Sequence, residues 1–173
     1  EFDDNPLDSL YRTVIAATKT VTPNIFNIFM GNDGTGLDSS GYYRRNSGDY
    51  FEWFDAGGFL GFDNPVWGEY IMVKDNVAAT TVWKSAAFNG TVTAIPLSVR
   101  FSYTILQKDV PISVTTSTGT VNYTNVIVVE EKIEAFDGTN WVDVTAQIDY
   151  YGKSYYARNV GLIKFEAFDA ANN

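Results

Sequence analysis

The residues best suited to chemistry are aromatic rings and carboxylates that are interleaved along one segment, residues 42–70. The rings are Tyr42, Tyr43, Tyr50, Phe51, Trp53, Phe54, Phe59, Phe62, Trp67 and Tyr70, and the carboxylates are Asp49, Glu52, Asp55, Asp63 and Glu69. Rings beside carboxylates suit sugars, and a ring-lined cavity suits apolar ligands. We predict that the ligand-contacting residues are Tyr50, Trp53, Phe54, Phe59, Phe62, Trp67 and Tyr70. A simpler interpretation, in which most of these rings fill the core, remains open.

Catalysis by the same segment has little support. The chain contains no Cys, and it contains no His. It therefore has no thiol or imidazole nucleophile, no serine–histidine triad and no thiolate or imidazole zinc site. Two carboxylates can hydrolyse glycosides, and Asp49, Glu52 and Asp55 are the candidates. On a strand, however, Glu52 faces away from the other two, so we predict no catalytic residue and no enzyme.

A metal site is the other chemistry to consider. Residues 31–38 carry Asn32, Asp33 and Asp38 among glycines, which are oxygen ligands of the kind that Ca²⁺ takes. The spacing departs from an EF-hand loop, and the same residues are ordinary turn formers. We predict no metal and no cofactor.

Charge and length limit the classes of partner. The 173 residues carry 12 basic and 21 acidic side chains, a formal net charge of −9. Nucleic acid and anionic lipid headgroups require a basic surface, so neither is expected as a partner. The length fits a single domain, residues 1–173, with a flexible tail over residues 1–6. No run of apolar residues is long enough for a transmembrane helix. Because the chain begins at Glu1 without a basic leader, we expect a removed signal peptide and an extracytoplasmic location.

The elements that position these residues are predicted to be strands. Residues 97–106 alternate strictly between two sets, which predicts a strand with one buried face. The buried set is Leu97, Val99, Phe101, Tyr103 and Ile105, and the outward set includes Arg100. We expect this strand in the interior of an antiparallel sheet of at least six strands.

Turn residues divide the second half into a meander. A long extended run covers residues 120–136, although a helix over residues 128–136 is an alternative. Asp137-Gly138-Thr139-Asn140 predicts a hairpin that folds residues 141–151 back. Residues 153–157 and 162–168 flank a further predicted turn at residues 158–161, with Asn159 or Gly161 at positive φ.

The first half is less regular. Leu7, Leu10, Tyr11, Val14 and Thr18 have helical spacing and predict a short N-terminal helix, although the segment is rich in β-branched residues. Residues 31–48 are rich in Gly, Asn, Asp and Ser and predict a loop. The predicted fold class is all-β and mostly antiparallel, as a curved meander or barrel-like sheet, with a β-sandwich as the alternative.

Two segments of the second half resemble a known group of proteins. Residues 121–129, VNYTNVIVV, and residues 155–164, YYARNVGLIK, look like the C-terminal half of uncharacterised secreted lipoproteins of Bacteroidetes. The resemblance covers residues 121–165, and Asn159 stands where a Gly is expected. It implies a sheet curved around an apolar interior, a lipid anchor on a Cys that precedes Glu1, and a place in the periplasm or on the cell surface of a Gram-negative bacterium. It implies no catalytic residue.

Three functions follow as hypotheses. The first is a non-enzymatic envelope protein that binds an apolar or amphiphilic, lipid-like ligand. The second is a carbohydrate-binding module with a glycan ligand, and the third is a hydrolase that uses Asp and Glu. An enclosed apolar cavity would favour the first, a row of exposed coplanar rings the second, and two facing carboxyls in a cleft the third.

Overall fold

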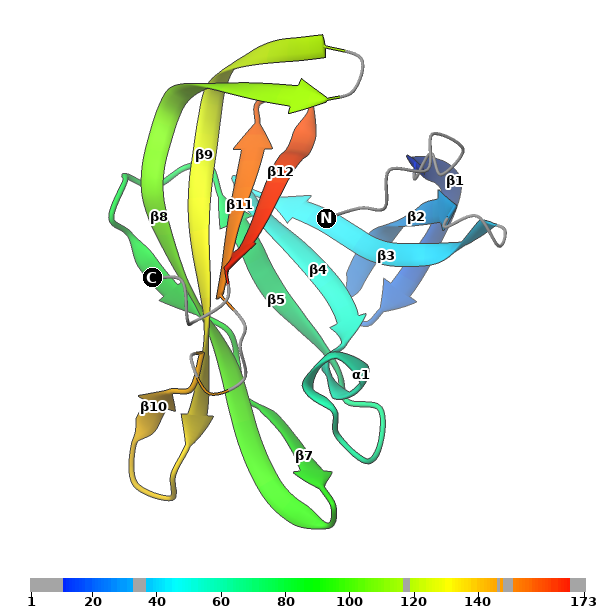
Figure 1. Ribbon diagram of the computed structural model, residues 1–173. Helices are drawn as coiled ribbons and strands as arrows, with labels where there is room; N and C mark the ends of the chain where they lie inside the picture. Colours follow the sequence, from blue (N-terminus) through cyan, green and yellow to red (C-terminus); the bar gives the residue numbers. More distant parts are fainter. Residues whose placement is uncertain (1–10, 33–36, 117–118, 146, 148–150, 169–173) are drawn as a thin grey trace.

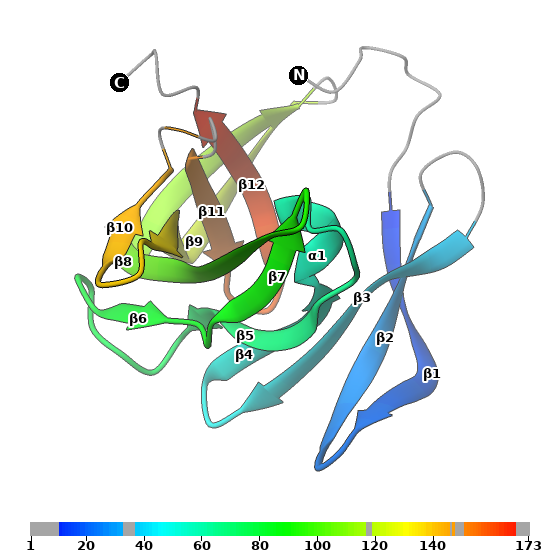
Figure 2. The same ribbon diagram turned by 90° about the horizontal axis from the view of Figure 1, so that it is seen from below.

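The structure, a computed structural model, describes residues 11–32, 37–116, 119–145, 147 and 151–168. These residues form two antiparallel sheets and a short helix (Figures 1 and 2). The predicted N-terminal tail, residues 1–6, lies outside the described residues. Within the described residues neither sheet closes into a barrel, and the prediction of an all-β, mostly antiparallel fold is confirmed.

The first sheet is a five-stranded meander in which every strand pairs with the next one in sequence. Its strands are β1 (Tyr11–Val21), β2 (Asn24–Asn32), β3 (Leu37–Asn46), β4 (Asp49–Asp55) and β5 (Trp67–Lys74). Helix α1 (Ala56–Leu60) lies between β4 and β5.

The second sheet has seven strands and follows the order β12-β11-β9-β8-β6, with β7 beside β8 and β10 beside β9. Its strands are β6 (Val82–Lys84), β7 (Phe88–Val92), β8 (Ile95–Thr116), β9 (Gly119–Phe136), β10 (Trp141–Asp143), β11 (Tyr151–Ala157) and β12 (Gly161–Phe168). Strand β8 is interior, because β9 pairs with one of its edges and β6 and β7 with the other.

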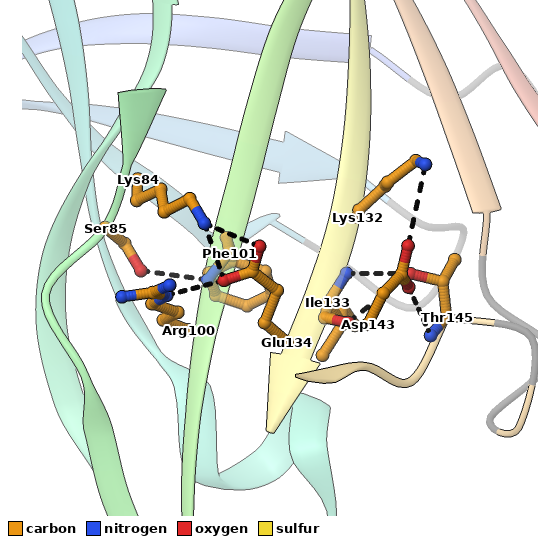
Figure 3. A network of polar contacts seen from close by, with 9 residues as sticks. All are labelled: Lys84, Ser85, Arg100, Phe101, Lys132, Ile133, Glu134, Asp143 and Thr145. Atoms are coloured by element: carbon orange, nitrogen blue, oxygen red, sulfur yellow. Dashed lines mark hydrogen bonds and ion pairs between the residues drawn. The ribbon is translucent and has the colours of Figure 1, made fainter. Parts of the chain in front are cut away.

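The predicted register of residues 97–106 is confirmed. Val99, Phe101, Tyr103 and Ile105 are buried, while Leu97 is half-buried. Arg100 points to the opposite face, where its Nε donates to a carboxylate oxygen of Glu134 on β9 at 2.6 Å (Figure 3). A one-residue shift of register would have buried Arg100 among apolar side chains at a cost of several kcal/mol.

The two sheets share one apolar core. Phe54 of β4 and Tyr70 of β5 approach Phe101 of β8, with ring centroids 5.9 and 5.6 Å away. Val73 and Ile133 are buried in the same core. Burial of large side chains from both sheets is the dominant stabilising term for such a packing.

A second, smaller cluster covers the opposite face of the seven-stranded sheet. Val126 and Val128 of β9 are buried there with Ala157 of β11. The distal ends of β8 and β9 supply the cover, because this hairpin bends where Asp109 and Asn125 adopt φ values of 55° and 54°. Figure 1 shows the bent hairpin above β11 and β12.

Both predicted turns of the second half are confirmed. Residues 137–140 connect β9 to β10, and the backbone N–H of Asp137 donates to the carbonyl of Asn140 at 3.0 Å. Of residues 141–151, only Trp141–Asp143 is described as pairing with β9. Residues 158–161 reverse the chain between β11 and β12, and both Asn159 and Gly161 have positive φ values, 61° and 104°.

Two predictions of secondary structure in the first half are wrong, and one alternative considered for the second half is not realised. The expected N-terminal helix is instead strand β1 from Tyr11 onward, because its β-branched residues pair with β2. The extended run predicted for residues 120–136 is confirmed as part of strand β9, so the alternative of a helix over residues 128–136 does not form. The loop expected over residues 31–48 contains β3, whose low apolar content reflects a strand that pairs on both edges and presents polar side chains. Residues 33–36 of that segment lie outside the described residues.

Candidate ligand-binding site

The seven predicted ligand-contacting residues do not form one surface. Tyr50, Phe54, Phe62 and Tyr70 pack into the core between the sheets, and Phe59 lies on α1 with 48% of its surface exposed. Trp53 and Trp67 lie on the other face of β4 and β5, away from the second sheet. The alternation of side chains along β4 causes this separation, since Phe54 and Trp53 are neighbours in sequence and must point to opposite faces.

The inward-facing rings are in contact with one another. The ring of Phe54 meets Tyr70 and Phe88 edge to face, at centroid distances of 4.9 and 5.7 Å. Tyr70 also stacks with Tyr103 at 5.8 Å. These rings fill the core, as the simpler interpretation of the aromatic segment proposed.

The three candidate carboxylates of β4 have separate partners. Glu52 points between the sheets and accepts hydrogen bonds from the hydroxyls of Tyr43, at 2.9 Å, and of Tyr70. Asp49 pairs with Lys74 Nζ at 2.9 Å. Asp55 caps helix α1 by accepting the N–H of Gly57 at 2.9 Å.

Burial and the Glu52 carboxylate raise the pKa of Tyr70 well above its usual value, so its hydroxyl remains a donor. Glu52 is therefore held by two neutral tyrosines inside the fold. These two hydrogen bonds satisfy the carboxylate of Glu52 inside the fold.

The outward-facing rings form a surface that we call the outer aromatic face, made of Tyr42 of β3, Trp53 of β4 and Trp67 of β5. The planes of Trp53 and Trp67 differ by only 20°, with centroids 6.4 Å apart. Tyr42 lies 6.4 Å from Trp67. Trp67 is 51% exposed, and Trp53 and Tyr42 are half-buried.

Trp53 rests on a buried support. Phe26 of β2 is completely buried, and its ring centroid lies 6.4 Å from that of Trp53. The guanidinium of Arg44 lies 3.6 Å from the ring centroid of Phe51 and 5.6 Å from that of Phe26. Trp53 therefore packs against a buried ring that is itself in contact with Arg44.

Polar groups line the same face. Arg44 donates through Nε to Glu69 at 2.8 Å and forms a second bond through its terminal nitrogen, a bidentate pair. Asn24 Nδ2 donates to the same carboxylate at 3.2 Å. Lys19 Nζ lies 5.8 Å from the ring centroid of Tyr42. The face thus combines flat rings with donors and acceptors that hydrogen-bond one another.

Sequence reasoning missed Lys19, Asn24, Phe26 and Arg44. The sequence predicts a loop over residues 31–48. Residues 42–46, Tyr-Tyr-Arg-Arg-Asn, do not alternate between apolar and polar types, so no local signal indicates that Arg44 lies on the same face as Tyr42.

One open hollow lies elsewhere, at the turn between β3 and β4. It is lined by Arg45, Ser47, Gly48, Asp75 and Asn76. Its residues bond with one another: Arg45 pairs with Asp75 at 3.1 Å, and Tyr50 donates its hydroxyl to the same carboxylate at 2.9 Å. Burial and that carboxylate raise the pKa of Tyr50. Tyr50 therefore packs against the core and bonds to Asp75 at the hollow, and it does not belong to the outer aromatic face.

The metal candidate at residues 31–38 cannot be followed in full, because residues 33–36 lie outside the described part of the chain. Within the described residues no cluster of three or more acidic side chains is placed to hold a metal ion. In the same part of the chain, no helix has the length and apolar character needed to cross a membrane.

Comparison with known proteins adds no assignment to this geometry: no family model matches the chain, and neither a curated protein nor a solved structure is significantly similar to it.

Proposed function

We propose that the protein is a non-catalytic binding domain that takes a glycan on the outer aromatic face. The observation that carries the proposal is the pair of nearly parallel tryptophan rings, Trp53 and Trp67, on an accessible surface. The face of an aromatic ring carries partial negative charge and offers a large rigid apolar area, which suits the C–H face of a sugar. The carbohydrate-binding alternative is therefore favoured over an apolar ligand between the sheets.

The polar part of the same face supports this ligand class. Arg44, Glu69 and Asn24 are held in one hydrogen-bonded row beside the rings. Groups that are already oriented lose little conformational entropy when they bind hydroxyls. These groups already hydrogen-bond one another, and a purely apolar ligand would cover them without adding any hydrogen bond, whereas hydroxyls can bind to their remaining donor and acceptor positions.

Two further parts of the proposal concern catalysis and location. The absence of catalysis is supported by the partners of the three candidate carboxylates. Asp49 pairs with Lys74, Glu52 accepts tyrosine hydroxyls, and Asp55 caps helix α1, so each carboxylate is bound to a different group. An extracytoplasmic location, with a lipid anchor before Glu1, follows from the resemblance of residues 121–165 to the Bacteroidetes lipoproteins and fits a domain that meets glycans outside the cell.

The test is affinity gel electrophoresis against a panel of soluble neutral polysaccharides, followed by calorimetric titration with oligosaccharides of any that retard the protein. Trp67→Ala and Trp53→Ala should each weaken binding about tenfold or more, as expected for aromatic residues at the centre of a site. Trp141→Ala is the matched control, because Trp141 lies on β10 of the other sheet.

Retention of the fold is checked by circular dichroism for each variant. Binding that survives both Trp53→Ala and Trp67→Ala would contradict the site. Saturable binding of lysophospholipid without any glycan binding would favour the apolar-ligand hypothesis, and turnover of a bound glycan would contradict the absence of catalysis.

A further inference from the structure

Strand β12 is an edge of the seven-stranded sheet. Its backbone pairs with β11 on one side, and no described strand pairs with its other side (Figure 1). An unpaired edge presents N–H and C=O groups to any strand that can lie beside it. Natural edges are commonly protected by charged side chains, proline or a bulge.

Strand β12 is only partly protected. Its pairing with β11 shifts register between Lys164 and Leu162, near the start of the strand, and is regular from Lys164 to Phe168. Leu162 and Phe165 are 51% and 47% exposed. Both lie on the same face of the sheet, because their cross-strand partners on β11, Tyr156 and Ser154, are two residues apart. Partial exposure of large apolar side chains at an unpaired edge favours association.

The charges of β12 are complementary to themselves. When two copies of the strand run antiparallel with Phe165 opposite Phe165, Lys164 of each copy faces Glu166 of the other. We propose that β12 pairs with β12 of a second copy in this register, which forms a two-fold symmetric dimer. The geometry is isologous, so both ion pairs form at once.

The charged groups are already held at the edge. Lys164 Nζ and a carboxylate oxygen of Glu166 are ion-paired along the strand, and the Tyr155 hydroxyl donates to Glu166 at 2.6 Å. When a second copy approaches, the two ion pairs would join into a network of four charges. The side chains are already held in place, so little further conformational entropy is lost. Networks of this kind gain more than isolated surface pairs.

The five-stranded sheet has two edges, β1 and β5. Strand β1 contains no acidic residue, so pairing with its own copy would form no ion pair. On β5, Glu69 is already paired with Arg44 and Lys74 with Asp49, both from neighbouring strands of the same chain. The inference for β12 does not depend on the proposed function.

Charge reversal gives a sharp test by sedimentation velocity over a wide range of protein concentration. The wild-type chain should show a concentration-dependent dimer. Lys164→Glu alone and Glu166→Lys alone should each weaken it about tenfold or more, because two symmetric attractions become repulsions. The double reversal should restore the homodimer, and an equimolar mixture of the two single variants should form a heterodimer. Lys132→Glu, which alters an ion pair on β9, should leave the dimer unchanged.

Cysteine cross-linking supplies a second measurement. The chain has no native Cys, and residues opposite each other in an antiparallel pair lie within the distance that a disulfide spans. Phe165→Cys should form a covalent dimer on mild oxidation, while Val142→Cys, also exposed, should not. A monomeric wild type, a dimer that both single reversals leave intact, or equal cross-linking of the two cysteine variants would each overturn the proposal.

Discussion

Replacing Glu134 of β9 by glutamine is expected to lower the free energy of unfolding by about 2 kcal/mol at neutral pH. The carboxylate of Glu134 accepts hydrogen bonds from Arg100 Nε, at 2.6 Å, and from Lys84 Nζ, at 2.7 and 3.0 Å (Figure 3). Its side chain is only 14% exposed, and that of Arg100 is 21% exposed. Hydrogen bonds to charged groups contribute about 1.5–3 kcal/mol, and removing the carboxylate leaves the charge of Arg100 partly desolvated.

The effect must depend on pH. Burial raises the pKa of Glu134, but the hydrogen bonds and charges of Lys84 and Arg100 outweigh burial, so its pKa is lowered. A carboxyl whose pKa is lowered by folding contributes stability that is present above its unfolded pKa and is lost as the pH falls through the folded pKa. The difference between wild type and Glu134→Gln should therefore be full at neutral pH and shrink below about pH 4.

Urea denaturation followed by circular dichroism, repeated from neutral to acidic pH, measures both quantities. Lys132→Gln is the control, because it removes an ion pair at 3.5 Å whose side chains are 40% and 48% exposed. That exposed pair should contribute less than about 1 kcal/mol. A cost for Glu134→Gln below about 0.5 kcal/mol, or a cost unchanged at acidic pH, would refute the reasoning.

Three other predictions address the core, a turn and a tyrosine. Phe101→Ala should cost about 3–5 kcal/mol in urea denaturation, because Phe101 is 1% exposed, and a value under about 2 kcal/mol would contradict its central place in the core. Gly161→Ala should cost about 1–2 kcal/mol through backbone strain alone, since φ is 104° and no atom lies within 4 Å of the added Cβ; a thermal midpoint equal to wild type would count against this. Burial and the Glu166 carboxylate raise the pKa of Tyr155 to about 12. In an alkaline titration followed by tyrosinate absorbance, Tyr155→Phe should therefore remove only the part of the absorbance increase that occurs near pH 12. The stability linked to Tyr155 is complete below the unfolded pKa near 10 and is lost as the pH rises through about 12.

The second half of the fold could be predicted from sequence because its signals are local. Alternation over residues 97–106 set the buried face of β8, and Asn159 and Gly161 set the turn before β12 by their tolerance of positive φ. The first half failed for the opposite reason. Residues 37–46 carry little apolar periodicity, and only pairing with β2 and β4 on both edges makes them a strand.

The candidate site was predicted only in part, for a related reason. Sequence identified an aromatic segment, and alternation separated Glu52 from Asp49 and Asp55. It did not decide which face of β4 would meet the second sheet, because both Trp53 and Phe54 are apolar enough to be buried. Packing of β8 against β4 and β5 assigned Phe54 to the core and left Trp53 outside.

The sequence by itself determined the all-β class, the register of β8 and the turns of the second half, because these depend on side-chain period and on the φ preferences of single residues. Tertiary structure alone decided that Lys19 contacts the ring of Tyr42 and that Asn24 and Arg44 meet at the carboxylate of Glu69. Their strands are separate in sequence and become neighbours only when the meander pairs. Tertiary structure also decided that β12 is an edge strand. Among the described residues, β12 pairs with β11 on one side and with no strand on the other.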